Sequence, residues 1–270
     1  MHQEFDPPVA LQDSIECFWY DRRDFGDQQT GFEVLPDGYA EIIFYFGNTV
    51  SIETGEGLQP LPSPFLTGLL NQPAIFYTKN RFEVIGIRCY PWTVFDLLGL
   101  QPGKDGVRTF DHPIAQLQAP LTDWLQVGKI EEAIDEVNRY FLHAHAHLAT
   151  DSMLFKAGVA MQEANGAIPV NQVAAAAHAT VRTLERKFKQ AAGYTVKDVS
   201  SVMRFQQVRN QLWMNPDSNL AGLAHELGYT DQSHLSKEFK RYSGTTPAAF
   251  ARKVKQEKQA GNDFVAFIQA

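Results

Sequence analysis

The sequence has few cysteines and no long apolar run. Its 270 residues include two cysteines, Cys17 and Cys89, which are too few for a disulfide framework or a zinc motif. No stretch approaches the roughly 18 consecutive apolar residues of a membrane-spanning helix. Residues 1–14 lack the basic-then-apolar order of a secretory signal. We therefore expect a cytoplasmic protein that makes no contact with a membrane.

Motifs of catalysis are also missing. The sequence contains neither a Gly-rich phosphate loop nor a Gly-x-Ser-x-Gly elbow. Cys17 has no neighbour in the sequence that would recognisably lower the pKa of its thiol. His143 and His147 would share one face of a helix, but no third ligand accompanies them at motif spacing. We therefore predict that the protein is not an enzyme and holds no metal or cofactor.

Charge is unevenly divided along the chain. The net charge is −7, yet residues 1–150 hold 9 Lys and Arg against 21 Asp and Glu, whereas residues 151–258 hold 15 against 9. An acidic front and a basic back indicate two modules with different partners, the basic one facing a polyanion. The charge distribution is equally consistent with two solvated surfaces of opposite sign that bind no polyanion. The motifs must distinguish between these two interpretations.

Residues 1–112 predict a β-rich domain. Several runs of β-branched and aromatic residues are separated by Gly, Pro and Asn turns, a pattern that favours a small barrel or sandwich. The runs expected to form strands are 32–35, 41–46, 74–77 and 82–90. Of the 32 aromatic residues of the chain, 17 lie in the first 100. Their rings could line a pocket for a small-molecule effector, or they could simply fill the core.

Two other segments have no motif of their own. Residues 113–150 become helical, with Ile130, Ile134, Val137 and Phe141 on a 3–4 residue apolar period. We predict a connector there, with a dimer surface as the alternative. The C-terminal tail, residues 257–270, contains an apolar run at 264–268. This run could dock onto the front domain or onto a partner, or it could be a frayed end.

The back half contains an internal repeat. Residues 173–180 align with residues 223–230 at an offset of 50. One extra residue, Asp231, then changes the offset to 51. From there, apolar, cationic and glycine positions recur: Leu184 with Leu235, Arg186 with Lys237, Phe188 with Phe239, Lys189 with Lys240, and Gly193 with Gly244.

Each repeat predicts a helix-turn-helix unit. Leucine and phenylalanine four residues apart form one buried stripe on the second helix. A Ser, Thr or Asp before that helix can cap it, and a residue in the left-handed conformation suits the turn and the helix end. The expected caps are Thr180 in the first unit and Thr230 or Asp231 in the second. The turns are expected at His178 and Gly228, and the helix ends at Gly193 and Gly244.

Further helices are predicted around the two units. A long helix over about 196–213 joins them, and Asn215-Pro216-Asp217 ends it because proline cannot continue a helix. A leading helix is expected over about 153–163. A closing helix starts at Thr246-Pro247, where threonine caps and proline occupies the first turn.

The back half resembles the AraC/XylS family of transcriptional regulators. Residues 227–250, LGYTDQSHLSKEFKRYSGTTPAAF, carry most of the resemblance, with earlier landmarks at 183–193 and 204–212. The resemblance covers about residues 151–255, and its motifs fall in the family's order and spacing. The front half is similar, more loosely, to a β-rich N-terminal domain of uncharacterised role found in some such regulators, through residues 35–38 and 42–47.

The resemblance implies that the second helix of each unit enters a major groove, so that one monomer contacts two successive grooves about 34 Å apart. Arginine can pair with guanine and glutamate can accept from cytosine, whereas lysines suit phosphates. The residues expected at bases are Arg182, Glu185, Arg186, Ser233, His234 and Lys237. The residues expected beside them, chiefly at phosphates, are Lys187, Lys189, Gln232, Ser236, Lys240 and Arg241. For each one the alternative is a solvated side chain or an intramolecular ion pair.

The sequence therefore predicts an α+β protein. A β-rich barrel or sandwich (1–112) and a helical connector (113–150) precede an all-α domain (151–256) with two helix-turn-helix units. We predict a sequence-specific transcriptional regulator of bacterial type whose partner is double-stranded DNA. RNA polymerase, a small-molecule effector and a second copy of the chain are further partners that the sequence leaves open. The first alternative is an effector-blind adaptor whose N-terminal domain only oligomerises; a metal-dependent enzyme ranks below it.

Overall fold

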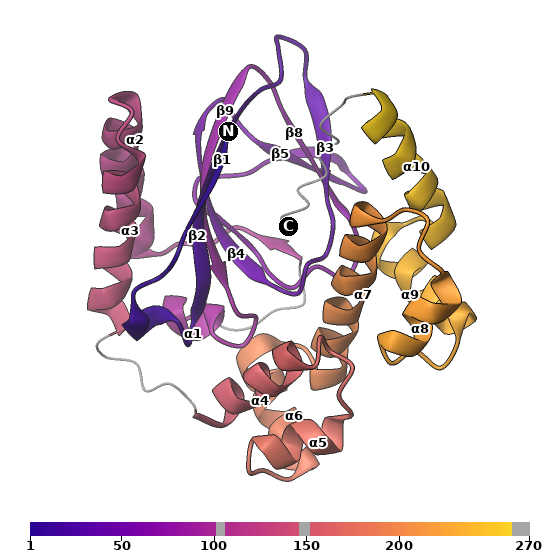
Figure 1. Cartoon of the computed structure of the whole chain (residues 1–270). Helices are drawn as coiled ribbons and strands as arrows, with labels where there is room; N and C mark the ends of the chain where they lie inside the picture. The colour runs from indigo at the N-terminus through magenta and orange to yellow at the C-terminus, as the bar shows by residue number, and fades with distance from the viewer. Residues whose placement is uncertain (101–105, 146–151, 261–270) are drawn as a thin grey trace.

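The computed structural model describes residues 1–100, 106–145 and 152–260. It confirms the predicted fold class: a β-rich N-terminal part is followed by a helical C-terminal part, whose helices lie below and beside the β-structure (Figure 1). The predicted apolar run 264–268 and His147 lie outside the described residues. Within the described residues, no helix is long and apolar enough to cross a membrane.

The larger sheet has six antiparallel strands in the order β1-β2-β9-β4-β7-β10. Their bounds are β1 (His2–Phe5), β2 (Ile15–Asp24), β9 (Arg81–Cys89), β4 (Ala40–Gly47), β7 (Phe65–Thr67) and β10 (Val107–Arg108). The sequence predicts β4 and β9 but not β2. Residues 17–21 of β2 are buried one after another, because the strand lies inside the sheet with both faces covered. Such a strand has no alternating pattern to reveal it.

The smaller sheet packs against one face of the larger sheet. Its antiparallel strands are β3 (Thr30–Val34), β8 (Ala74–Thr78), β5 (Ser51–Thr54) and β6 (Gly57–Pro60), in that order. The sequence predicts β3 and β8, whereas the β5–β6 hairpin is too short and too exposed to show an apolar pattern. Aromatic and aliphatic side chains from both sheets form one buried cluster between them.

The other face of the larger sheet is covered by helices. These are α1 (Val94–Leu98), a 3-10 turn (Pro113–Leu117), α2 (Gln118–Gln126) and α3 (Ile130–His145), with α2 and α3 side by side on one flank (Figure 1). Ile134, Val137 and Phe141 of α3 are buried in one cluster with residues of the sheet. The ring centroid of Phe141 lies 6.5 Å from that of Phe18 on β2. The helical segment after residue 112 is therefore an integral layer of the N-terminal part.

The C-terminal part consists of seven helices within residues 152–260. They are α4 (Ser152–Glu163), α5 (Val170–Ala176), α6 (Val181–Ala192), α7 (Val196–Met214), α8 (Leu220–Glu226), α9 (Gln232–Ser243) and α10 (Pro247–Ala260). The long helix α7 is confirmed. It begins with a capping box, in which the Thr195 side chain accepts from the Asp198 N–H and the Asp198 side chain accepts from the Thr195 N–H. It ends one residue before Asn215-Pro216, as predicted.

One apolar core extends from the C-terminal helices to the β-structure. Trp92, which follows β9, is 2% exposed, and its ring centroid lies 5.4 Å from that of Phe188 on α6. Gly158 of α4 makes room for the indole, because a Cβ at that position would lie 2.1 Å from the Trp92 ring. Leu35 and Leu69 belong to the same buried cluster. The two parts of the molecule therefore contact each other directly.

Candidate nucleic-acid interface and inter-sheet pocket

The first helix-turn-helix unit consists of α5 and α6. Thr180 caps α6, since its Oγ1 accepts the N–H of Thr183 at 3.2 Å. In the turn between the helices, His178 has a φ of +52°, the left-handed conformation expected there. Gly193 and Gly244 end the second helices of the two units with φ of +75° and +71°. The ends of both candidate recognition helices are therefore fixed by local sequence.

The second unit, α8 and α9, repeats the first with small changes. Asp231, and not Thr230, is the N-cap of α9, because its Oδ1 accepts the N–H of His234 at 2.7 Å. Gly228 has a φ of +72° in the turn, where the first unit has His178. The carboxylate of Asp231 also lies at the positive end of the α9 dipole, which favours it over a neutral cap.

The predicted buried stripes are confirmed. Leu184, Phe188 and Leu235 are fully buried, and Phe239 is 1% exposed. The ring centroid of Phe239 lies 5.1 Å from that of Phe205 on α7, so the second unit is anchored to the connecting helix. A helix that buries one stripe presents the opposite side to its surroundings. The stripes therefore decide which residues of α6 and α9 face outward.

On α6 the predicted DNA-binding residues differ in their surroundings. Lys187 is half-buried. Glu185 is half-buried too, and its Oε2 accepts the N–H of Val196, the first residue of α7, at 3.3 Å. Glu185 therefore has a structural role at the start of α7. The exposed members of the set are Arg182, Arg186 and Lys189.

On α9 the ring of His234 is turned back toward the turn. Its Nδ1 accepts the N–H of Thr230 at 3.4 Å, and the ring stands edge-on to Tyr229 with 5.3 Å between centroids. Ser236 is half-buried. Arg241 lies over the ring of Tyr242, at the end of α9 that borders a space of about 130 Å³ shared with the β-structure. The exposed members of the set on α9 are Gln232, Ser233, His234, Lys237, Lys240 and Arg241.

Arg204 of α7 joins the two units, and sequence reasoning did not single it out as a functional residue. Its Nη1 donates to the carbonyl of Gly166, just before α5, at 2.9 Å, and its Nη2 pairs with Glu238 of α9 at 3.3 Å. The guanidinium also lies over the ring of Tyr229, 5.3 Å from its centroid. The orientation of one unit relative to the other therefore depends on this side chain.

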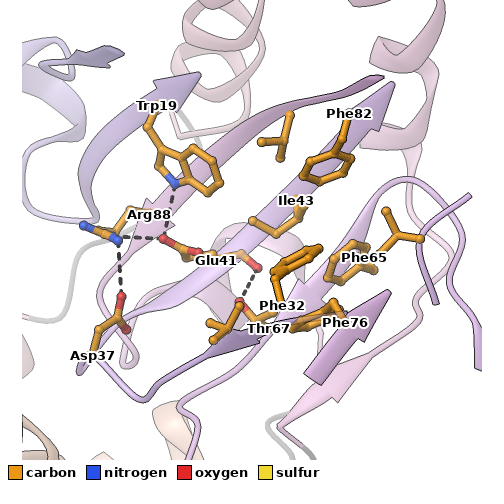
Figure 2. Close-up of a pocket in the computed structure, with 13 residues that line it drawn as sticks. Trp19, Phe32, Asp37, Glu41, Ile43, Phe65, Thr67, Phe76, Phe82 and Arg88 are labelled. Atoms are coloured by element: carbon orange, nitrogen blue, oxygen red, sulfur yellow. Dashed lines mark hydrogen bonds and ion pairs between the residues drawn. The ribbon is translucent and has the colours of Figure 1, made fainter. Parts of the chain in front are cut away.

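The N-terminal part contains a pocket of about 50 Å³ between its two sheets (Figure 2). Its apolar walls come from both sheets and are formed by Trp19, Phe32, Val34, Ile43, Val50, Phe65, Phe76, Phe82 and Val84. Gly86, opposite Trp19 in the sheet register, lets the indole lie close, because a Cβ there would be 2.1 Å from it. The aromatic rings are buried between the two sheets and leave a small pocket among them.

The polar end of the pocket is an ion cluster (Figure 2). Arg88 is 9% exposed; its Nε donates to Glu41 at 2.9 Å and its Nη2 to Asp37 at 3.2 Å. The indole Nε1 of Trp19 donates to the same oxygen of Glu41 at 3.2 Å. Burial raises the pKa of Glu41 to about 7, although the Arg88 charge opposes the shift. Two carboxylates therefore share one guanidinium at this end.

The side chains considered for catalysis lie apart from this cluster or are unreactive. Burial raises the pKa of Cys17 to about 12, so its thiol stays protonated and is a poor nucleophile. His143 is exposed near the end of α3. Among the described residues, no three His, Cys, Asp or Glu side chains gather in a way that could hold a metal ion.

Comparison with protein families separates the same two parts. Residues 173–253 match the family described as a helix-turn-helix domain. Residues 3–104 match a family described as a domain of unknown function, DUF6597. No curated protein sequence matches the chain significantly.

ToxT and AdpA are two of the proteins whose solved structures have a distant similarity to this chain. ToxT from Vibrio cholerae is 10% identical, with 87% of this chain and 98% of that chain covered, at a TM-score of 0.45. The DNA-binding domain of AdpA, a global transcriptional factor solved in complex with a target DNA, is 22% identical. Its match covers 41% of this chain and 98% of that chain at a TM-score of 0.37. These are distant similarities at the level of the fold.

Proposed function

We propose that this chain is a DNA-binding transcriptional regulator of the AraC type and that it contacts two successive major grooves through α6 and α9. Each unit would place its second helix in one groove, about 34 Å from the other along one side of the duplex. The N-terminal part, whose layers extend to residue 145, would serve as the sensor of a small molecule. The site of action would be the cytoplasm, where DNA and RNA polymerase are accessible.

The observation that carries this proposal is the pairing of buried and exposed positions across the repeat. Leu184 and Phe188 fix the orientation of α6, and Arg186 is exposed on the opposite side. On α9, Lys237 is exposed at the position that corresponds to Arg186 in the repeat, and Leu235 corresponds to Leu184. A cation therefore recurs at the same outward position of both helices, which suits a polyanionic double helix.

The structure favours a division of roles among the predicted residues. On α6, Arg182 and Arg186 are four residues apart and exposed, so both suit base edges, where arginine pairs with guanine. On α9 the corresponding pair is Ser233 and Lys237. Glu185 is better explained as a positioning residue, because it accepts the N–H of Val196. The residues that suit phosphates are Lys187, Lys189, Gln232, Lys240 and Arg241.

Selection of bound sequences from random duplex DNA tests the proposal with the full chain. We expect enriched sites with two conserved segments whose centres lie about 10 base pairs apart, one helical turn. Enrichment of a single segment, or no enrichment, would contradict the two-groove arrangement. The logarithm of the affinity should fall linearly with the logarithm of the salt concentration, because the bound lysines and arginines release counterions from the phosphates.

Substitution of the repeated cations tests which residues contact the bases. Arg186→Ala and Lys237→Ala should each weaken specific binding by about 1–3 kcal/mol if the side chain contacts a base edge. Gel-shift titration measures the affinity, and circular dichroism checks that the fold is intact. Arg139→Ala, an exposed arginine on α3, is the matched control and should leave the affinity unchanged. Unchanged affinity in both test variants would remove these residues from the interface.

A further inference from the structure

The ion cluster of the inter-sheet pocket has unused capacity to accept hydrogen bonds. Both donors that reach Glu41, from Arg88 and Trp19, bind the same oxygen, Oε1. Its Oε2 accepts no hydrogen bond from the described residues. Asp37 takes the remaining contact of Arg88, so Glu41 shares this guanidinium with a second carboxylate. A ligand that brings a positively charged donor would meet an available acceptor on a carboxylate that is only partly neutralised by its arginine.

The walls of the pocket restrict the rest of that ligand. Phe32, Phe65, Phe76 and Phe82 lie opposite the ion cluster (Figure 2), with Phe32 and Phe76 stacked at 5.8 Å between centroids. Such rings favour an apolar body, and their faces also attract a cation. The pocket volume of about 50 Å³ is larger than the roughly 10–15 Å³ that one water molecule needs. It is still small enough that only a small molecule can enter.

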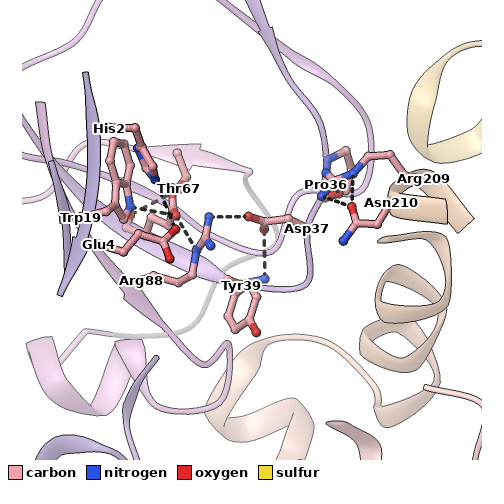
Figure 3. A network of polar contacts seen from close by, with 11 residues as sticks. His2, Glu4, Trp19, Pro36, Asp37, Tyr39, Thr67, Arg88, Arg209 and Asn210 are labelled. Carbon is pink, nitrogen blue, oxygen red and sulfur yellow. Dashed lines mark hydrogen bonds and ion pairs between the residues drawn. The ribbon is translucent and has the colours of Figure 1, made fainter. Parts of the chain in front are cut away.

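One short loop lies between this cluster and α7 (Figure 3). Residues 35–38 belong to the connection between β3 and β4, and they contact α7. A Cβ on Gly38 would lie 3.5 Å from Met203, and the carbonyl of Pro36 accepts from Nη1 of Arg209 at 3.4 Å. Asp37, between these two residues, is bound to Arg88 of the pocket. One short loop therefore touches the pocket on one side and the helix between the DNA-binding units on the other.

Arg209 is the residue of α7 that donates a hydrogen bond to this loop. Its side chain is fully buried, and among the described residues no carboxylate forms an ion pair with it. Its hydrogen bonds go to Pro36 and to Oδ1 of Asn210, at 3.1 and 3.2 Å for the latter. Burial lowers the pKa of Arg209 to about 10, and the charge of Asp37 opposes this shift. Asp37 is therefore the counter-charge that two buried arginines, one in each part of the molecule, have in common.

We propose that the inter-sheet pocket binds a compact apolar amine, with the ammonium group at Glu41 Oε2, and that the 35–38 loop transmits its binding to α7. An ammonium group that binds Glu41 weakens the pull of Glu41 on Arg88. Arg88 then draws Asp37 more strongly, and Asp37 stabilises Arg209 less. The contact between the loop and α7 is weakened, and the two helix-turn-helix units lose part of the support that orients them. The last step rests on the proposed function.

Binding of a defined amine by the full chain tests the ligand class. The probe is cyclohexylamine, with cyclohexanol and cyclohexanecarboxylate as matched neutral and anionic molecules, measured by thermal shift and titration calorimetry. We expect only cyclohexylamine to raise the melting temperature. Glu41→Gln should weaken its binding at least about tenfold, because a charge-assisted hydrogen bond is lost. Glu56→Gln, an exposed glutamate in the β5–β6 turn, is the matched control.

Three results would overturn the ligand class. These are binding of cyclohexanecarboxylate in place of the amine, equal binding of the amine to Glu41→Gln, and no binding of the amine. If the Glu41→Gln variant does not fold, the Val84→Met variant is used to test the same pocket. The longer side chain occupies the pocket wall without changing a charge, so it must abolish binding of cyclohexylamine.

The DNA affinity of the same preparations tests the transmission. For a duplex obtained by selection, cyclohexylamine should lower the affinity of the wild-type chain at least about fivefold, the low end of common allosteric couplings. Asp37→Asn should still bind the amine but show no change in DNA affinity. DNA affinity that is indifferent to bound amine would overturn the transmission alone. Failure of the wild-type chain to bind any duplex without amine would instead overturn the proposed function.

Discussion

Arg204 illustrates how a single residue can hold two DNA-binding units together. It contacts Gly166 at the edge of the first unit and Glu238 in the second, and its guanidinium is stacked on Tyr229. The side chains of Arg204 and Glu238 are 14% and 12% exposed, so their charges are largely removed from water. A buried charge left without its partner is strongly unfavourable. The pair therefore matters more to stability than the exposed cations of α6 and α9.

We expect Arg204→Ala to lower the free energy of unfolding by about 3 kcal/mol, since Glu238 would keep its charge and lose its cationic partner. Urea denaturation followed by circular dichroism measures the change. Arg139→Ala removes an arginine that is 66% exposed and should stay within about 0.5 kcal/mol of the wild type. Equal losses in the two variants would show that burial of the Arg204 pair has no special weight.

The pH dependence of stability should carry a contribution from Glu41. Its pKa is raised from 4.5 to about 7 in the folded protein, chiefly by burial, so the folded state binds the proton more tightly than the unfolded state. The contribution of Glu41 to the free energy of unfolding is therefore fully present below pH 4.5, and it is lost as the pH rises toward 7. We therefore expect the unfolding free energy of the wild type to fall, relative to Glu41→Gln, across that interval.

Chemical denaturation of both chains at several pH values measures this difference. Exposed carboxylates contribute to both curves alike, so they cancel in the comparison. Parallel curves, or a difference that grows in the opposite direction, would show that Arg88 holds the Glu41 carboxylate ionised throughout.

The sequence distinguishes inward from outward residues well, but it does not show where an outward side chain bonds. Leu184 and Phe188 were predictable from their spacing, and so was the exposure of Arg186. The contact of Glu185 with Val196 depends on how α7 approaches α6, and no local pattern encodes that approach. The same limit applies to Arg204, whose contacts with Gly166 and Glu238 depend on how α7 packs between the two units.

At the scale of elements, the turn of each helix-turn-helix unit needs a residue in the left-handed conformation. His178 and Gly228 both occupy it, with φ of +52° and +72°. At Gly228 a Cβ would also lie 3.1 Å from Ala167, so a larger residue faces both backbone strain and a close neighbour. Gly222 lies six residues earlier, inside α8, where no neighbouring atom outside the helix backbone is closer than 3.8 Å to an added Cβ.

Two alanine substitutions in the second unit should therefore have opposite signs. Gly228→Ala should destabilise the protein by about 1–2 kcal/mol, the usual penalty of a left-handed alanine. Gly222→Ala should stabilise it by about 0.5–1 kcal/mol, because alanine loses less backbone entropy in a helix than glycine. Thermal unfolding of the two variants side by side measures both changes. A stabilised Gly228→Ala would mean that the turn relaxes to another conformation.

Some helices and strands can be predicted from the sequence more easily than others. The helices of the C-terminal part were predictable because caps such as Thr180, prolines and glycines mark their ends. Strand β2 was not predictable, since consecutive buried residues remove the two-residue period. The segment 113–145 was correctly expected to be helical. Its packing against the larger sheet depends on contacts with residues such as Phe18, over a hundred positions away in the chain.

At the scale of the whole molecule, Gly158 and Trp92 form a close contact between the two parts. Glycine inside a helix is normally less stable than alanine by about 1 kcal/mol. Here a Cβ would lie 2.1 Å from the indole, so Gly158→Ala forces the two parts to move apart. The sequence alone could not show this, because a glycine within α4 has no partner until both parts are folded.

We expect Gly158→Ala to destabilise the protein by about 1–3 kcal/mol, the common penalty of overpacking. Shortening the opposing side chain should relieve the clash. In a double-mutant cycle, Gly158→Ala combined with Trp92→Ala should be more stable than the sum of the single changes by at least about 1 kcal/mol. Unfolding free energies from urea titration supply the cycle, and additive effects would show that the two residues do not meet in solution.

The length of α7 has a consequence for the promoters that such a regulator can serve. Its 19 residues form one continuous helix of about 28 Å between the two DNA-binding units. An extra base pair between two half-sites would turn the second one by about 35° around the duplex axis, since one turn holds about 10 base pairs. A rigid spacer cannot follow that rotation. New target genes would therefore be acquired through base changes at a constant separation, and insertions or deletions between half-sites would silence a promoter outright.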